Sequence, residues 1–191
     1  MSGKIELTLP AVARTAAVTE TPLGRLTVPS RAIPERRVTV DPAELARLRD
    51  MARAAAARAH APYSGFTVGA ALVMADDPER RVFTGANVEN ASYGGTICAE
   101  RTAITQAASA GFRRISVLAV SCVQALHARI ADRSPCGACR QVFAEFATDA
   151  PPSLVLIDSG DEDALGEILD LERLLPYRSR DRKSTRLNSS H

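Results

Sequence analysis

The order of apolar patterns from Asp41 onward is the feature that most constrains the fold of this 191-residue chain. Apolar residues first recur at helical spacing, and strand-like and helical runs then alternate along the sequence. The predicted order of elements is helix, strand, strand, helix, strand, helix, strand. Alternation of this kind is typical of a sheet that is covered by helices on both faces. We therefore predict an α/β protein, a three-layer α/β/α sandwich with a central mixed sheet of about five strands.

The predicted elements have recognisable boundaries. Asp41 can cap a helix and Pro42 suits its first position, so the first helix should begin here and end near His60, before Pro62. Asp76, Asp77 and Pro78 predict a turn between the first two strands, which makes those strands a hairpin. The remaining predicted helices are 98–110 and 134–146, and the predicted strands are 66–74, 81–88, 115–123 and 154–157.

The two ends of the chain differ from its centre. Residues 1–40 contain four prolines and no sustained periodicity, so we predict a mostly irregular N-terminal extension with a short strand or two at most. Residues 41–178 should form one domain. Residues 179–191 are polar and lack a core-facing pattern, and we predict a non-native or disordered tail there.

Composition excludes several classes of partner. The formal net charge is only +2, aromatic residues make up 4% and Trp is absent, so we expect no nucleic-acid partner. No apolar stretch is long enough to cross a membrane, and charged residues interrupt the N-terminus, so neither a membrane span nor a signal peptide is expected. A reducing, cytoplasmic location follows as an expectation, and in it cysteines more often bind metal or serve catalysis than form disulfides; three of the four lie in motifs.

Two cysteine motifs indicate a metal site. Cys98 opens the sequence Cys-Ala-Glu, and Pro-Cys-Gly-Ala-Cys contains Cys136 and Cys139; each motif falls at the predicted start of a helix, with a strand between them. Three thiolates leave one position of a tetrahedral zinc ion open for water, which is the pattern of a catalytic site. Helix N-termini favour thiolates because the helix dipole is positive there. The three cysteines are therefore the predicted zinc ligands.

The residues beside Cys98 complete the predicted chemistry. Glu100 lies two residues from a ligand, where it can take a proton from a zinc-activated water and deliver it to substrate. Zinc with three thiolates carries a formal charge of −1, which weakens its ability to acidify water. We hypothesise that Arg101 donates to a cysteine sulfur and offsets this charge.

Weaker interpretations remain for each motif alone. A lone C-x-x-C pair is also compatible with a redox site or structural zinc, and C-x-E alone is too short a motif to indicate a function. A redox site leaves Cys98 and Glu100 without a role, and a structural site lacks a good candidate for its fourth ligand. Cys122 lies in an apolar run and is predicted to be a core residue.

Residues 41–178 resemble the short, homotetrameric, zinc-dependent cytidine deaminases. Five runs carry the resemblance in family order: APYSGF at 61–66, VGAAL at 68–72, NVENASY at 87–93, CAERTA at 98–103 and SPCGACRQ at 134–141. The resemblance implies hydrolytic deamination of cytidine and 2′-deoxycytidine to the uridines, with release of ammonia, in pyrimidine salvage. Zinc, one ion per subunit, would activate the water that attacks C4, while Glu100 would protonate N3 and then the leaving amino group.

The resemblance also implies substrate contacts that spacing alone does not reveal. Asn87 and Glu89 would hold the ribose 3′-hydroxyl, and Phe66 would pack on the pyrimidine. The backbone amide of Ala99 would face the base carbonyl. Ala91 and Tyr93 would reach the 5′-hydroxyl in a neighbouring subunit, so the partners implied are a nucleoside and three further copies of the chain with shared active sites.

One departure and three alternatives accompany the resemblance. Family members carry a phenylalanine three residues after the Leu-Leu-Pro near the end, and Ser179 stands there in this chain, with Tyr177 as a partial substitute. A blasticidin-S-type or other amino-heterocycle deaminase would share the zinc ligands and Glu100, although the Asn-Val-Glu-Asn run from Asn87 favours a ribose-bearing substrate. Deamination of single-stranded nucleic acid conflicts with the low charge. A non-catalytic zinc or subunit-interaction protein would have no need of Glu100.

Overall fold

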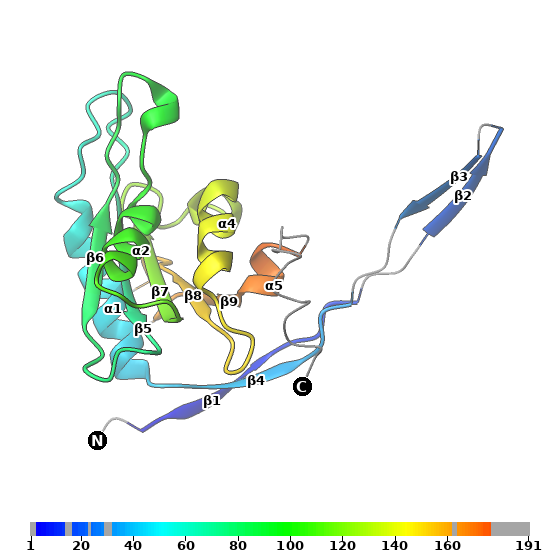
Figure 1. Cartoon of the computed structure of the whole chain (residues 1–191), viewed down its shortest axis with the longest axis horizontal. Coiled ribbons are helices and arrows are strands. Elements are labelled where there is room, and N and C mark those ends of the chain that lie inside the picture. Colours follow the sequence, from blue (N-terminus) through cyan, green and yellow to red (C-terminus); the bar gives the residue numbers. More distant parts are fainter. Residues whose placement is uncertain (1–2, 14–16, 23, 29–31, 162–163, 177–191) are drawn as a thin grey trace.

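The computed structural model describes residues 3–13, 17–22, 24–28, 32–161 and 164–176. Tyr177, Ser179 and the predicted tail therefore lie outside the described residues. Figure 1 shows the arrangement of the elements, with a layered body and an N-terminal segment that extends beyond it.

A five-stranded mixed sheet forms the centre of the body, as predicted. Its order is β6-β5-β7-β8-β9, with β7 and β8 parallel and the other neighbours antiparallel. Two of the strands form the predicted hairpin. The strands are β5 (Val68–Met74), β6 (Val82–Ala86), β7 (Ile115–Cys122), β8 (Leu154–Ile157) and β9 (Glu167–Asp170).

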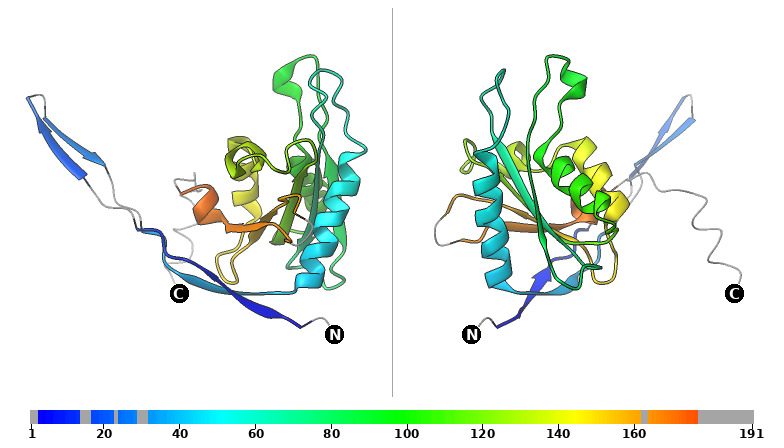
Figure 2. Two further views of the ribbon diagram at one scale, coloured as in Figure 1. Left: turned by 180° about the vertical axis from the view of Figure 1, so that it is seen from behind. Right: turned by 60° about the vertical axis from the view of Figure 1, so that its left-hand side comes forward.

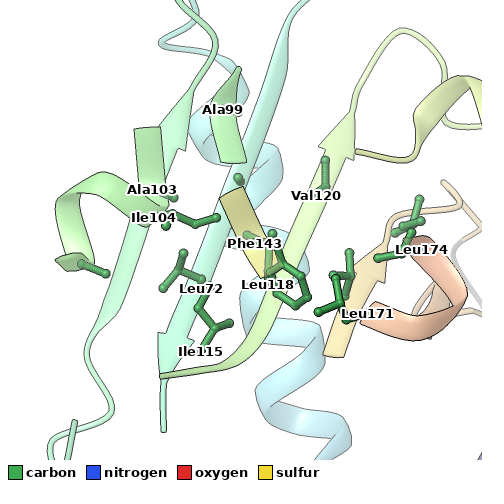
Figure 3. Packing of buried hydrophobic residues seen from close by; sticks show 14 of the residues in the cluster. Leu72, Ala99, Ala103, Ile104, Ile115, Leu118, Val120, Phe143, Leu171 and Leu174 are labelled. Carbon is green, nitrogen blue, oxygen red and sulfur yellow. The ribbon is translucent and has the colours of Figure 1, made fainter. Parts of the chain in front are cut away.

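Helices cover both faces of this sheet, which confirms the predicted α/β/α sandwich (Figure 2). On one face, Ala71 and Val73 of β5 pack with buried residues of α1 (Pro42–Ala56). On the other, the alternate residues Leu72 and Met74 pack with α2 (Ala99–Ser109), α4 (Gly137–Phe146) and α5 (Leu171–Leu174). Figure 3 shows Leu72 in this second cluster beside labelled residues of all three helices. The period of two along β5 thus divides the core between two layers.

The structure confirms the predicted start of the first helix, corrects its predicted end and adds short elements. Asp41 caps α1 as expected, since its Oδ1 accepts from the backbone N–H of Ala43 at 2.9 Å. The helix ends at Ala56 rather than near His60, because the next residues close tighter turns of the i→i−3 kind. Three short helical segments, η1 (Tyr93–Gly95), α3 (Ile130–Arg133) and α5, and strand β9 were not predicted, because three or four residues are too few to establish a period.

Residues 1–40 contain more regular structure than the sequence predicts. The described part of this segment includes four strands, and Pro10, Pro22 and Pro34 lie between strands, where a residue without an N–H is tolerated. β1 pairs with β4, and Leu9, Val38 and Val40 of this ribbon are buried against the layer of α1. β2 pairs with β3 in a hairpin that projects away from the body (Figures 1 and 2). The strands are β1 (Ile5–Leu9), β2 (Ala17–Thr21), β3 (Gly24–Val28) and β4 (Arg36–Val40).

None of the helices in the described part of the chain combines the length and the apolar character that spanning a membrane requires.

Candidate active site

Three cysteines from two helix starts meet at one point. Cys98 is the N-cap of α2, Cys136 is the N-cap of α4, and Cys139 lies in the first turn of α4. Their Sγ atoms all lie within 4.8 Å of one another. The Sγ of Cys136 is 3.5 Å from that of Cys139 and 3.9 Å from that of Cys98. The structure therefore brings together the three residues that the sequence singles out as ligands, and we call them the three-cysteine cluster.

The dimensions of the cluster fit a tetrahedral metal ion. Sulfur atoms that bind one zinc ion at about 2.3 Å with tetrahedral angles lie roughly 3.8 Å apart. The Sγ–Sγ distances from Cys136 to Cys139 and to Cys98, 3.5 and 3.9 Å, bracket that spacing. Thiolates are soft ligands suited to zinc, and three of them leave one coordination position for another molecule.

The close packing of α2 on the sheet depends on a glycine. A Cβ atom at Gly85 of β6 would lie 2.3 Å from the carbonyl oxygen of Ala99 and 2.6 Å from the N of Ala103. Any larger residue at Gly85 would therefore push the first turn of α2 outward. Because Cys98 caps this turn and Glu100 lies within it, the glycine sets the position of both side chains.

Electrostatic interactions within the cluster favour a thiolate at Cys98. A hydrogen bond from the Cys139 thiol, together with Arg101, lowers the pKa of Cys98 to about 5, although burial opposes the shift. The same hydrogen bond and burial raise the pKa of Cys139. The cluster therefore carries negative charge at neutral pH, which attracts a metal cation.

Glu100 is buried beside the cluster. Glu100 is 4% exposed. Burial, together with the charge of Cys98, raises the pKa of its carboxyl group to about 7. A hydrogen bond to Cys139 acts in the opposite direction but is outweighed. A carboxyl group that gains and loses a proton near neutral pH is suited to general acid–base chemistry.

Arg101 lies next to the cluster on the same helix. Its Nη2 donates to the carbonyl oxygen of Thr96 at 2.7 Å and lies 3.8 Å from the Sγ of Cys98. The hydrogen bond with Cys98 raises the pKa of the Arg101 guanidinium, so the charge is retained. This geometry agrees with the hypothesis that Arg101 offsets thiolate charge, and its effect on reactivity remains a prediction.

The two residues predicted to hold ribose are already engaged with the chain. The Asn87 side chain accepts from the N–H of Val68 at 2.8 Å and donates to the carbonyl oxygen of Phe66 at 2.9 Å. Glu89 accepts from the N–H groups of Tyr63 and Ser64 at 2.9 and 3.2 Å and from the Ser64 hydroxyl.

These contacts leave part of the hydrogen-bonding capacity of both side chains free in principle. An amide has two donor hydrogens and two acceptor lone pairs, and a carboxylate has about four acceptor sites. The hydrogen bond with Ser64 lowers the pKa of Glu89, so the carboxylate is ionised at neutral pH. The first hydrogen bonds therefore position the two side chains without exhausting them.

The other predicted substrate residues lie in exposed segments or at the start of a helix. Phe66 is 37% exposed, and Tyr93 is 78% exposed with its ring 6.4 Å from that of Tyr63 in an edge-on arrangement. Ala91 is exposed in the same loop. Ala99 is the first residue of α2, where backbone N–H groups have no acceptor within the helix.

Sequence reasoning assigned no contacts to Arg133, Arg140 or Asp158. Arg133 and Arg140 flank the Pro-Cys-x-x-Cys motif and bind backbone around it, and Asp158 accepts from Arg53 and Ser121 behind it. The available signal was an arginine directly after Cys139 and a second one two residues before Pro135. Cys122 is 6% exposed, which confirms the prediction of a core residue.

Together, the fold and the site define an α/β sandwich protein with a thiolate metal centre and a buried acid. Residues 43–151 match the family described as the cytidine and deoxycytidylate deaminase zinc-binding region. The chain belongs to this family, and the predicted zinc cofactor is confirmed to that extent: the family binds zinc and the cluster could bind a metal ion.

Individual relatives agree with the family match. The chain is 46% identical over 105 residues to a probable cytidine deaminase of Dictyostelium discoideum, a match that covers 54% of this chain and 65% of the relative. It is 52% identical over 92 residues to a cytidine deaminase of Halalkalibacterium halodurans, covering 46% and 61%. The chain thus spans less than two thirds of the length of these curated relatives.

A solved structure extends the likeness to the whole fold of a relative. The crystal structure of a cytidine deaminase from Burkholderia pseudomallei has a TM-score of 0.58 and 41% sequence identity. The match covers 70% of this chain and 97% of that chain.

Proposed function

We propose that this chain is a zinc-dependent enzyme that deaminates cytidine and 2′-deoxycytidine to uridine and 2′-deoxyuridine. The proposal is carried by the burial of Glu100 against the three-cysteine cluster. A structural zinc site would use four protein ligands and has no need of a buried, titratable carboxyl group beside it. The similarity to relatives that are named cytidine deaminases supports the same reaction.

The proposed reaction adds water across the C4–N3 bond of the base and then removes ammonia from C4. Zinc held by the three cysteines would act as a Lewis acid that makes water a nucleophile at neutral pH. Glu100 receives the proton that water loses and donates it to N3 of the base, then carries a second proton to the leaving amino group. One water is consumed and one ammonia is released, so atoms balance without any redox partner.

Residues around the base and sugar would orient the substrate for this proton relay. Asn87 and Glu89, held by their contacts with the 63–68 segment, would bind the ribose 3′-hydroxyl. Phe66 would pack on the pyrimidine, and the N–H of Ala99 would donate to the base carbonyl. Arg101 would offset thiolate charge through its contact with Cys98.

The exposed part of the site supports a proposal about assembly. Tyr93 and Ala91 lie in an exposed loop, where they would reach the 5′-hydroxyl of a substrate bound to a neighbouring copy. We therefore include in the proposal a homotetramer with shared sites, working in cytoplasmic pyrimidine salvage on free nucleosides rather than on nucleic acid. The domain limits 41–178 and the extension 1–40 remain part of this proposal.

The experiment that tests the function compares the wild-type protein with Glu100→Gln. Both are assayed for release of uridine and ammonia from cytidine, and zinc content is determined on both. The variant should keep about one zinc per chain and lose roughly two to four orders of magnitude in rate, as expected for removal of a general acid–base.

Each other outcome has a defined meaning. If the wild-type protein binds zinc and leaves cytidine unchanged, the substrate assignment is wrong, and a blasticidin-S-type or other amino-heterocycle substrate takes its place. If Glu100→Gln retains the wild-type rate, the proposed proton relay is wrong. Absence of zinc from the wild-type protein would contradict the whole proposal.

A further inference from the structure

The turn that leads into Cys136 is held by Arg140, a residue to which the proposed chemistry gives no role. Its Nε donates to the carbonyl oxygen of Pro135 at 2.7 Å, and its Nη2 donates to the Oγ of Ser134 at 2.9 Å. Its Nη1 donates to the carbonyl oxygen of Leu174 at 2.9 Å. One planar guanidinium therefore joins the two residues before Cys136 to the end of α5.

Arg133 directly precedes the same turn, and its side chain makes several hydrogen bonds to other parts of the chain. This side chain is 7% exposed, and its Nη1 donates to the carbonyl oxygen of Asp158 at 2.9 Å and to Oε2 of Glu167 at 2.6 Å. Its Nη2 binds the second carboxylate oxygen of Glu167, and its Nε donates to the carbonyl oxygen of Ala128 at 2.8 Å. A two-pronged pair with a carboxylate fixes direction as well as distance.

The side chains of both arginines donate hydrogen bonds to one segment near the C-terminal end of the described residues. Glu167 begins β9, and Leu174 ends α5. This segment, residues 167–174, lies beyond residues 43–151, the part that matches the zinc-binding family. Its own attachment is firm, because Leu171 and Leu174 are buried in the same core cluster as Phe143 of α4 (Figure 3).

Cys136 is the member of the cluster with the greatest need of such support. It is exposed, whereas Cys139 is buried and Cys98 is partly buried. Packing therefore fixes the position of Cys139 but contributes little to the position of Cys136. The sulfur of Cys136 can hold its place only if the backbone of its turn is fixed, and that backbone is what Arg140 binds.

We propose that Arg140 and Arg133 are positioning residues that fix Cys136 in metal-binding geometry by anchoring its turn to segment 167–174. Outer contacts of this kind commonly set metal affinity, and their loss costs about 10- to 100-fold. The inference rests on zinc binding at the cluster as proposed above, and it extends the metal site to a part of the chain that holds no ligand.

A different role for Arg140 would be to screen the charge of the thiolates, as its place next to Cys139 suggests. Its three nitrogens donate instead to oxygen atoms of the turn and of α5. Lysine keeps the charge but cannot reproduce a planar fork with several fixed donors. Arg140→Lys therefore separates positioning from screening.

The test uses the full chain and four variants, Arg140→Lys, Arg133→Lys, Glu167→Gln and the control Arg129→Lys. Arg129 is the N-cap residue of α3, the short helix that ends at Arg133, and its ion pair with Asp132 is exposed. Zinc affinity is measured by competition with a chelator, and the visible absorption of the cobalt-substituted protein reports the ligand geometry. The unfolding midpoint of each metal-free variant is recorded in parallel.

Arg140→Lys and Arg133→Lys should lower zinc affinity about 10- to 100-fold and change the cobalt spectrum, while the metal-free proteins remain folded. Glu167→Gln should shift both in the same direction by less, and Arg129→Lys should match the wild-type protein. Wild-type affinity and spectrum in the first two variants would overturn the inference. An effect explained entirely by unfolding of the metal-free variants, with Glu167→Gln unchanged, would overturn it too. A wild-type protein without zinc contradicts the proposed function instead.

Discussion

The two halves of the candidate site are built differently. The metal half consists of helix starts, arginines that bind backbone and side chains that are buried or partly buried except for the exposed Cys136, with Cys139 1% and Glu100 4% exposed. The substrate half consists of loops around residues 60–67 and 87–97, where Tyr93 is 78% and Tyr63 is 55% exposed. Within the described residues, one chain therefore brings together all the predicted zinc ligands, whereas the aromatic side chains of the substrate half are exposed. Changes in the first half should affect metal and stability, and changes in the second should affect substrate alone.

Removal of a ligand should have the largest effect. Cys139→Ser places a hard hydroxyl where a buried thiolate lies, so zinc affinity and turnover should fall together to background. Elemental analysis after dialysis and a cytidine assay measure the two. Cys122→Ser serves as the control, because that thiol lies outside the cluster and burial raises its pKa to about 12. Retention of stoichiometric zinc by Cys139→Ser would remove this residue from the ligand set.

Core substitutions should separate the halves by stability. Phe143 of α4 is 2% exposed and packs beside Leu118 under the metal half (Figure 3). Phe143→Ala should lower the free energy of unfolding by about 3–5 kcal/mol. Phe66 is the matched aromatic of the substrate half and is 37% exposed, so Phe66→Ala should cost about 1 kcal/mol or less and instead raise KM. Denaturant titration and steady-state kinetics measure the two effects, and equal losses of stability would contradict the division.

The same division explains what could be predicted from the sequence. The metal half follows from local rules: a cysteine at a helix cap, a second three residues later, and a carboxylate in the first turn need no knowledge of distant contacts. The contacts of Arg133 and Arg140 could not be predicted because their partners, Glu167 and the carbonyl oxygen of Leu174, lie 34 residues away in elements too short to show a period.

The substrate half could not be derived from spacing at all. Asn87 and Glu89 gained a role only through the family resemblance, because their sequence neighbours say nothing about what lies opposite them. Residues 1–40 taught a related lesson. Their prolines and lack of periodicity predict a short strand or two, yet the described residues there form four strands. β1 and β4 are stabilised by pairing with each other across 27 or more residues, a long-range contact that local propensity does not report.

A smaller stability effect should come from the charges behind the metal half. Asp158 is 2% exposed and accepts from Arg53 at 2.7 Å and from Ser121 at 2.7 Å. Asp158→Asn removes the negative charge that pairs with the Arg53 guanidinium, and we expect a loss of about 2–3 kcal/mol. This is below the cost of breaking a fully buried pair because Arg53 keeps 33% of its side chain exposed. Asp132→Asn, in an exposed pair with Arg129, should change stability by about 0.5 kcal/mol or less.

The pH dependence of this difference provides a second test. Burial alone would raise the pKa of Asp158, but hydrogen bonds from Arg53, Ser121 and Gly160 outweigh it and hold the pKa below 3.8. A carboxyl group with a lowered pKa in the folded state stabilises the fold above its unfolded pKa and loses this effect as pH falls through the folded value. The wild-type advantage over Asp158→Asn should thus be constant near neutral pH and shrink below 3.8. An advantage that grew with acid would contradict the assigned ionisation.

The smallest effect on stability should come from Tyr93, and it tests whether the substrate half is completed by another copy. Tyr93→Phe should leave the free energy of unfolding within about 0.5 kcal/mol, since the side chain is 78% exposed. If the hydroxyl binds the substrate 5′-hydroxyl, its loss should lower kcat/KM for cytidine about 2- to 10-fold, the worth of one hydrogen bond. For 5′-deoxycytidine, which lacks that group, the wild-type protein and the variant should have equal kcat/KM. A sharper form mixes inactive Glu100→Gln chains that carry Tyr93 with active Tyr93→Phe chains. Recovery of kcat/KM per active site in the mixed assembly means that the tyrosine acts on a neighbour's substrate, and no recovery after verified subunit exchange means that the substrate half belongs to one chain.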